Sequence, residues 1–267
     1  MSSGAVLEAC VDCPASARAA IAGRVNSIEL CAGLATGGVT PSLGLIRAVA
    51  CMAAAATPPV PITVLVRLRD GDFVYSPDDI AVMVDDIAAI GSLAADLPPG
   101  AIAGVAIGAL APDGTADLVA TAAMARAAQE AGLAITLHRA FDAAIDPVAA
   151  YLAVVDHLAG AVSRVLTSGG AATAAAGTDA LHQLLAGLAS TTHGQAVTVV
   201  AAAGLSPTSA SGVLAAGAHG VHGSFSTIVV RADDEAAVAG EAIGFGRGHR
   251  ETDAEVVAAV ADVMALS

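Results

Sequence analysis

Polar chemistry in this chain is concentrated in the run TLHRAFD, residues 136–142. His138, Arg139 and Asp142 follow an apolar stretch, although only 13% of all residues are charged. A histidine titrates near neutral pH, and an arginine binds anions through a planar set of donors. At the end of a buried strand this combination favours a site over a structural role. We therefore predict His138 and Asp142 as catalytic residues and Arg139 as an anion ligand.

Two other runs each carry a glutamate and a cysteine two positions apart. Glu8 and Cys10 lie in VLEAC, and Glu29 and Cys31 lie in SIELC. Side chains alternate along a strand, so each glutamate shares a face with its cysteine. On neighbouring strands, about 4.8 Å apart, Cys10 and Cys31 can approach one another. Both cysteines could instead be small buried packing residues, whereas a buried carboxylate needs a partner, which makes the two glutamates candidate catalytic groups.

The run VRLRDGDF supplies cations at the end of a third strand. Arg67 and Arg69 alternate onto one face, and Asp72 follows them. We expect the arginines to pair with Glu8 and Glu29 and to bind an anionic ligand together with Asp72. A purely structural set of ion pairs is the alternative, although such pairs are a poor source of stability.

Small and hydroxyl-bearing residues end two later strands, in the runs TSGG and VHGS. Backbone N–H groups in Gly-rich loops can approach a phosphate or a carboxylate. The same pattern is also typical of a simple turn. The candidate substrate-binding residues of these two loops are Ser168, Gly169, Gly170, His222 and Ser224.

These residues need a scaffold that brings strand ends together. Eight apolar runs alternate with Ala-rich helical stretches in 267 residues, which predicts one α/β domain, a (β/α)8 barrel of the TIM type spanning 1–267. A doubly wound open sheet is the alternative. We expect 226–250 to be a long loop after the last strand. The predicted strands are 6–10, 27–31, 62–67, 102–108, 134–138, 162–167, 196–201 and 220–223.

Composition excludes several classes of protein. The formal charge of −14 argues against nucleic acid as a partner. Apolar stretches too short for a bilayer and the lack of a signal-peptide pattern lead us to expect a cytoplasmic protein with no membrane partner. All eleven basic residues are arginines, which excludes Schiff-base, pyridoxal-phosphate and P-loop chemistry. The four cysteines are expected to be free thiols.

Six runs together resemble the CutC copper-homeostasis family, in family order and from residue 6 to about 225. They are LEAC, SIELCAGLATGGVTPSLGLI, VRLRDGDFVYS, LHRAFD, VLTSGG and VHGS. The resemblance implies a barrel fold, a cytosolic homo-oligomer (a dimer or a tetramer) and a role in copper handling, with Cu(I) proposed on Cys10 and Cys31. The chain departs from the family pattern at Leu68 and Asp70, where proline and glycine are usual.

Two functions follow from these patterns. The first is copper homeostasis with Cu(I) on a dithiolate, which suits this soft ion. The second is a TIM-barrel enzyme that acts on a small phosphorylated or carboxylated substrate by general acid/base chemistry. The residues alone favour the enzyme, because a site for a soft monovalent ion needs no carboxylates or arginines, whereas the resemblance favours copper. A catalytically inactive barrel that serves as an interaction scaffold is a third alternative.

Overall fold

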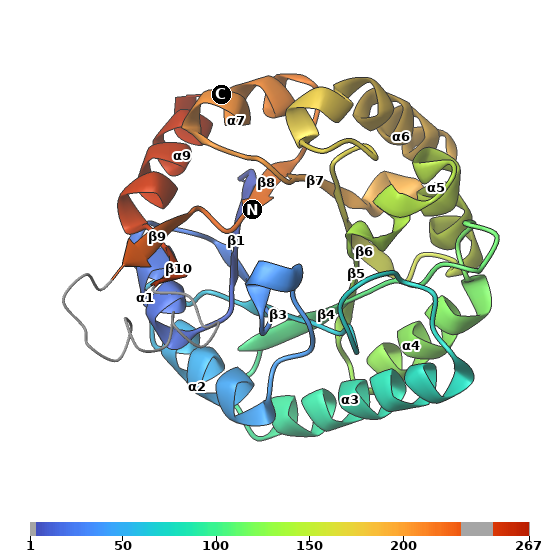
Figure 1. The fold of residues 1–267 in the computed structure, drawn as a ribbon, viewed down its shortest axis with the longest axis horizontal. Helices are drawn as coiled ribbons and strands as arrows, with labels where there is room; N and C mark the ends of the chain where they lie inside the picture. Colours follow the sequence, from blue (N-terminus) through green and yellow to red (C-terminus); the bar gives the residue numbers. More distant parts are fainter. Residues whose placement is uncertain (1–3, 231–247, 267) are drawn as a thin grey trace.

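The computed structural model describes residues 4–230 and 248–266 and confirms the predicted barrel. Eight parallel strands, hydrogen-bonded in chain order, close into a barrel, and the helices form a ring around them (Figure 1). The strands are β1 (Val6–Val11), β2 (Ser27–Leu30), β3 (Ile62–Leu65), β4 (Ile102–Ile107), β5 (Ala134–Leu137), β6 (Val162–Thr167), β7 (Thr198–Ala202) and β8 (Gly220–Gly223).

The helices begin at local capping signals. Proline occupies the first turn of α1, α3, α5 and α7, where its missing N–H group costs nothing. Pro41 precedes α2 instead, because Ser42 caps this helix by accepting a 3.2 Å bond from the Leu45 amide. The helices are α1 (Pro14–Ala22), α2 (Leu43–Ala54), α3 (Pro77–Ala95), α4 (Leu118–Glu130), α5 (Pro147–His157), α6 (Thr178–Ser190), α7 (Pro207–Ala215) and α9 (Ala254–Leu266).

Short 3-10 helices lie in the connections. Three of them follow strands β2, β5 and β6, at the end of the barrel that carries the polar residues. The fourth leads from α6 into β7. They are η1 (Leu34–Thr36), η2 (Arg139–Ala143), η3 (Ala174–Gly177) and η4 (Gly194–Ala196).

The strands are buried on both faces, as parallel strands under a ring of helices must be. Their outer side chains pack against the helices in one large apolar core. Inside the barrel the apolar side chains form only small clusters, one of which contains Cys10, Cys31, Leu65 and Ala106. Much of the interior is therefore left to polar side chains, and these build the site.

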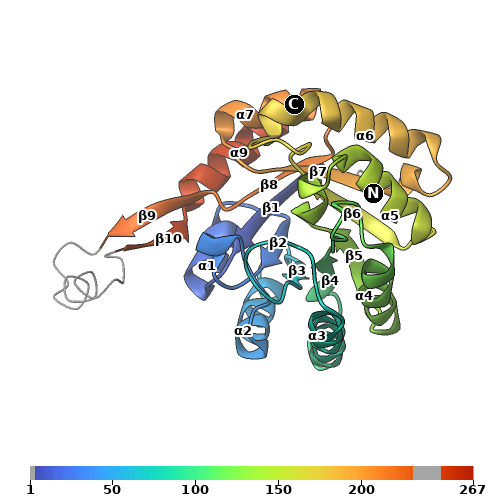
Figure 2. The same ribbon diagram turned by 45° about the vertical axis from the view of Figure 1, so that its right-hand side comes forward.

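The stretch 226–250 is not the single long loop that the sequence predicted. An antiparallel hairpin of β9 (Ser226–Val230) and β10 (Gly248–Thr252) projects from the barrel (Figure 2). The prediction is wrong at both ends of the stretch, and residues 231–247 lie outside the described residues. No short turn joins the two strands in sequence, so the usual hairpin signal is lacking. Helix α9 then completes the ring between α7 and α1 (Figure 1).

None of the helices in the described part of the chain has both the length and the apolar character needed to cross a membrane.

Candidate functional site

A cavity of about 910 Å³ opens at the C-terminal ends of the barrel strands, where the sequence predicted a site. The predicted site residues that line it are Cys10, Glu29, Arg67, His138, Arg139, Asp142, Gly170, His222 and Ser224. The predicted residues outside its lining are Glu8, Cys31, Arg69, Asp72, Ser168 and Gly169. The cavity thus brings together side chains that are far apart in sequence.

Glu8 is buried inside the barrel and has three side-chain partners. Ser27 Oγ donates a 2.6 Å hydrogen bond to Oε2, and Arg164 forms an ion pair with the same oxygen. His222 Nδ1 lies 3.0 Å from Oε1. Burial alone would raise the pKa of Glu8, but the hydrogen bond with His222 and the charge of Arg164 outweigh it and lower the pKa to about 2. Glu8 is therefore an ionised, structural carboxylate at neutral pH.

The expected pairing of Glu8 and Glu29 with Arg67 and Arg69 is wrong. Arg164, from β6, forms the ion pair with Glu8 instead. The prediction assumed that strands close in sequence supply the partners. In a closed barrel, however, a long inward side chain reaches across the interior from another wall.

Both arginines of the third strand end bind groups within their own loops. Arg67 donates to the carbonyl oxygens of Gly38, at 2.9 Å, and Gly71, at 2.8 Å. Arg69 lies at the surface and forms a 2.9 Å ion pair with Asp72. The hydrogen bond from Arg69 lowers the pKa of the Asp72 carboxyl group. Arg69 and Asp72 therefore brace their loop outside the cavity wall, while Arg67 remains within it.

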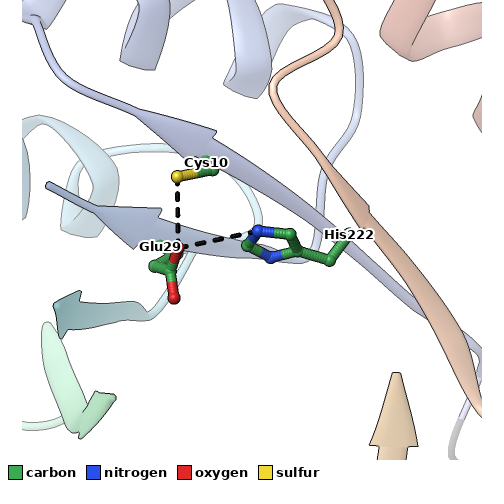
Figure 3. Close-up of side chains that lie close together, drawn as sticks. All are labelled: Cys10, Glu29 and His222. Carbon is green, nitrogen blue, oxygen red and sulfur yellow. Dashed lines mark hydrogen bonds and ion pairs between the residues drawn. The ribbon is translucent and has the colours of Figure 1, made fainter. Parts of the chain in front are cut away.

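Three buried side chains converge beside the cavity (Figure 3). The Cys10 thiol donates a 3.1 Å hydrogen bond to Glu29 Oε2, and His222 Nε2 lies 3.6 Å from the same oxygen. One ligand atom from each of these residues lies within 4.8 Å of the others, which is close enough for a shared metal ion. Cys31 Sγ approaches Cys10 Sγ to 3.8 Å, so the two thiols predicted to meet do so.

The protonation of this group follows from burial and neighbouring charge. The contact with Cys31, burial and the Glu29 carboxylate all raise the pKa of Cys10. Burial raises the pKa of Glu29. Burial lowers the pKa of His222, but Glu29 and Glu8 raise it more, and the net direction is upward. In the metal-free protein these surroundings stabilise the neutral form of the Cys10 thiol and the protonated form of His222.

His138 follows β5 and caps η2. The Ala140 amide donates a 3.2 Å bond to its Nδ1, and its Nε2 is buried with no hydrogen-bond partner in the part of the chain that the structure describes. Burial, and then the charge of Arg67, lower the pKa of the imidazole from 6.5 to about 4. His138 is therefore neutral at physiological pH, and a backbone amide rather than a carboxylate of the described residues holds its ring.

Asp142 fastens the loops after β5 and β6 to each other. It accepts hydrogen bonds from Arg139 Nε at 2.9 Å, Thr167 Oγ1 at 2.6 Å and the Ser168 amide at 2.8 Å. Arg139 also donates a 2.9 Å bond to Ser168 Oγ. The Tyr151 hydroxyl lies 3.3 Å from Asp142 Oδ1 and donates its proton to the nearer Leu166 carbonyl oxygen, at 2.7 Å. These contacts give Asp142 a positioning role, and they occupy part of the Arg139 guanidinium.

The amides of Gly169 and Gly170 are also engaged by the protein. Gly169 donates a 2.8 Å bond to Thr167 Oγ1, and Gly170 donates a 3.4 Å bond to Asp142 Oδ1. Both glycines have positive φ, and a Cβ at Gly169 would lie 2.3 Å from the Gly177 carbonyl oxygen. The loop therefore needs glycine for its shape and close packing, and its amides do not form an empty anion cradle.

Sequence reasoning missed Arg164 and Ser27, which bind Glu8, and Arg250, which lines the cavity from the hairpin. Arg164 interrupts the apolar strand VSRVLT, and a charge inside a buried strand requires a partner, so the signal was available. No sequence signal pointed to Arg250, because the 2.9 Å bond from its Nε to Ser226 Oγ depends on the hairpin.

Comparison of the sequence with known proteins identifies its family. The family model described as CutC family matches residues 5–227. A family protein CutC of Rhizobium meliloti is 43% identical over 179 residues, which cover 67% of this chain and 66% of the relative. A relative from Agrobacterium fabrum with the same description is 38% identical over 254 residues, covering 94% of this chain and 91% of its own length.

A solved structure agrees with the fold. A CutC protein from Streptococcus agalactiae superposes with a TM-score of 0.70 at 22% sequence identity, covering 82% of this chain and 98% of its own. The family match extends through β8 and includes every predicted site residue. The sequence match and the barrel agree, and the chain belongs to the CutC family.

Proposed function

We propose that this protein acts in copper homeostasis and binds Cu(I) through Cys10 and Cys31. The observation that carries the proposal is the 3.8 Å approach of the two Sγ atoms. Thiolates are soft ligands that suit Cu(I). The Streptococcus agalactiae relative is named for copper homeostasis, which supports the same role here.

The residues around the thiols fit a cargo ion that is taken up and released. Metal binding requires thiolates, whereas the pKa of Cys10 is raised in the free protein. Glu29 Oε2, 3.1 Å from Cys10 Sγ, is placed to accept the proton that the thiol loses. Because each thiol must lose its proton to bind Cu(I), the affinity increases with pH. The harder donors of Glu29 and His222 make Zn(II) the competitor to test.

Competition against a Cu(I) chelator tests the proposal. Cys10→Ser and Cys31→Ser should each remove most of the affinity, because each deletes half of the soft donor set. Cys51→Ser is the matched control, since this thiol is exposed on α2. Equal loss in all three variants, or no loss in any of them, would show that the thiols are packing residues.

A second function has its own supporting observation. Glu29 Oε1, Arg67 Nε and His138 Nε2 are buried without a hydrogen-bond partner among the described residues, and all three residues line the cavity. Native proteins leave few such atoms unsatisfied unless they serve a ligand or catalysis. We therefore propose, as the alternative, an enzyme that acts on a small anionic substrate by general acid/base chemistry, with Glu29 and His138 as its catalytic residues.

Hydrogen exchange tests this second function. The protein, kept metal-free with a chelator, is incubated in D2O with small carboxylates and phosphate esters. NMR then follows the loss of signals from carbon-bound protons. Exchange with the wild type and none with Glu29→Gln would support acid/base catalysis. An absence of exchange with every compound would count against proton abstraction at this site.

We further propose that the protein is a cytoplasmic homo-oligomer, a dimer or a tetramer, with neither nucleic acid nor membrane as a partner. Cell fractionation tests the location. Light scattering of the purified protein tests the assembly, and a monomeric mass would contradict it.

A further inference from the structure

Arg67 is a buried cation without a counter-ion in the described part of the chain. Its side chain is held by carbonyl oxygens, which are neutral, and the residue is only 5% exposed. Asp72, an acid of the same loop, pairs with Arg69 instead. Tyr75 interacts with Arg67 as a neutral phenol, since burial raises the pKa of its hydroxyl group. An unpaired buried charge is costly, and an anionic ligand would offset that cost.

His138 offers a donor beside this cation. Its Nδ1 accepts the Ala140 amide, so the proton of the neutral ring is on Nε2, which faces no acceptor in the described structure. Arg67 and His138 both rest on Phe73: the guanidinium carbon lies 4.7 Å from the centroid of this ring, and the two ring centroids lie 5.6 Å apart. Two N–H groups without acceptors, Arg67 Nε and His138 Nε2, are thus held by one aromatic side chain.

We propose that Arg67 and His138 form a binding site for the carboxylate group of a small organic acid. The inference deepens the second function proposed above and rests on the same cavity, and it does not depend on copper binding. Arg67 supplies the counter-charge, and His138 supplies an uncharged hydrogen bond to the same oxygen or to an adjacent carbonyl oxygen. A neutral imidazole in this position polarises a carbonyl group without adding a second positive charge.

A carboxylate fits this donor set better than a phosphate. Two free N–H groups match the two oxygens of a carboxylate, whereas a phosphate ester presents three oxygens and nearly two charges. The Nη1 and Nη2 groups of Arg67 each donate one bond within the protein, to Gly38 and Gly71. The volume of about 910 Å³ leaves room for the rest of a metabolite.

Nuclear magnetic resonance of the histidine side chains tests this site in the full-length protein. The probes are acetate, lactate and pyruvate, with inorganic phosphate and chloride as references at equal ionic strength. The long-range 1H–15N spectrum reports each imidazole nitrogen separately, and the spectrum of His138→Asn identifies the His138 signals. We expect a protonated Nε2 in the free protein and a saturable shift of this signal with at least one carboxylate.

The paired variants are Arg67→Met and Arg47→Met. Arg67→Met removes the charge and should weaken carboxylate binding about tenfold to hundredfold, the range for a lost charged hydrogen bond. Arg47→Met is the control, because this arginine is exposed and pairs with Asp96 far from the site. If Arg67→Met does not fold, the wild-type titration still decides whether the His138 signal responds.

Three results would overturn the inference: no carboxylate shifts the His138 signal, phosphate binds as tightly as the best carboxylate, or Arg67→Met binds as the wild type does. The experiments distinguish failure of the carboxylate site from failure of the copper site or of the enzyme. Cys31→Ser should abolish Cu(I) binding and keep the carboxylate response. Binding of a carboxylate without hydrogen exchange in D2O would support the site and contradict the enzyme.

Discussion

Replacing Glu8 by Gln should destabilise the barrel, and the size of the loss follows from the lowered pKa of Glu8. The pKa of Glu8 falls from 4.5 to about 2 on folding, despite its burial, because His222 and Arg164 bind the carboxylate. A shift of one pKa unit corresponds to about 1.4 kcal/mol, so the ionised form contributes about 3 kcal/mol at pH 7. Gln keeps the shape and removes the charge, and it should forfeit about this amount.

Urea unfolding followed by circular dichroism measures the loss. Glu130→Gln is the matched control, since Glu130 is exposed at the end of α4, and it should change stability by less than about 0.5 kcal/mol. The direction in which the stability changes with pH also follows from this pKa shift. A lowered carboxyl pKa gives stability that is present above 4.5 and is lost as the pH falls towards 2, so the effect of Glu8→Gln should shrink to about 2 kcal/mol at pH 3.5.

Arg164 completes the test through a double-mutant cycle. Arg164→Met leaves the buried Glu8 carboxylate without its cation and should cost about 3–5 kcal/mol. The double variant should cost at least about 1 kcal/mol less than the sum of the single losses, because no stranded charge remains. A loss below about 1 kcal/mol for Glu8→Gln, or strict additivity with Arg164→Met, would refute the assigned ion pair.

The remaining predictions concern the rim of the barrel. His138→Asn should remove a pH dependence, because the pKa of His138 falls from 6.5 to about 4 on folding. As the pH is lowered from 6.5 to 4, the free energy of unfolding of the wild type should decline by up to about 3 kcal/mol relative to the variant. Parallel plots of unfolding free energy against pH for the two proteins would contradict this. Gly108→Ala should cost about 1–3 kcal/mol and displace the His138 ring, since the new Cβ would lie 2.9 Å from Cε1, whereas Gly212→Ala, in open space on α7, should be neutral or stabilising. Asp142→Asn should cost about 1.5–3 kcal/mol by loosening the loops after β5 and β6, and an unchanged urea midpoint would count against its positioning role.

The barrel could be predicted from the sequence because its signals are local. Each strand is a short apolar run, and prolines at 14, 77, 147 and 207 occupy the first turns of helices. The approach of Cys10 and Cys31 also followed from local information, since alternation and the spacing of neighbouring strands were sufficient. The resemblance to the CutC family is confirmed by the family match over 5–227.

The partners inside the barrel could not be assigned by the same reasoning. Glu8 pairs with Arg164, 156 positions away, and this choice depends on how the closed sheet is staggered. Arg67 has the charge but lies at the rim, where backbone carbonyls hold it. The hairpin of β9 and β10 was missed because residues 231–247 separate its strands in sequence, so the short-turn pattern of a hairpin is lacking.

X-ray absorption of the protein loaded with one equivalent of Cu(I) tests the central claim most directly. The spectrum reports the atoms bound to copper without any assumption about activity. We predict a first shell of two sulfur atoms, supplied by Cys10 and Cys31, with one of them lost in Cys10→Ser and both retained in Cys51→Ser. A first shell of nitrogen and oxygen atoms, or a spectrum that Cys10→Ser leaves unchanged, would contradict the proposed copper site.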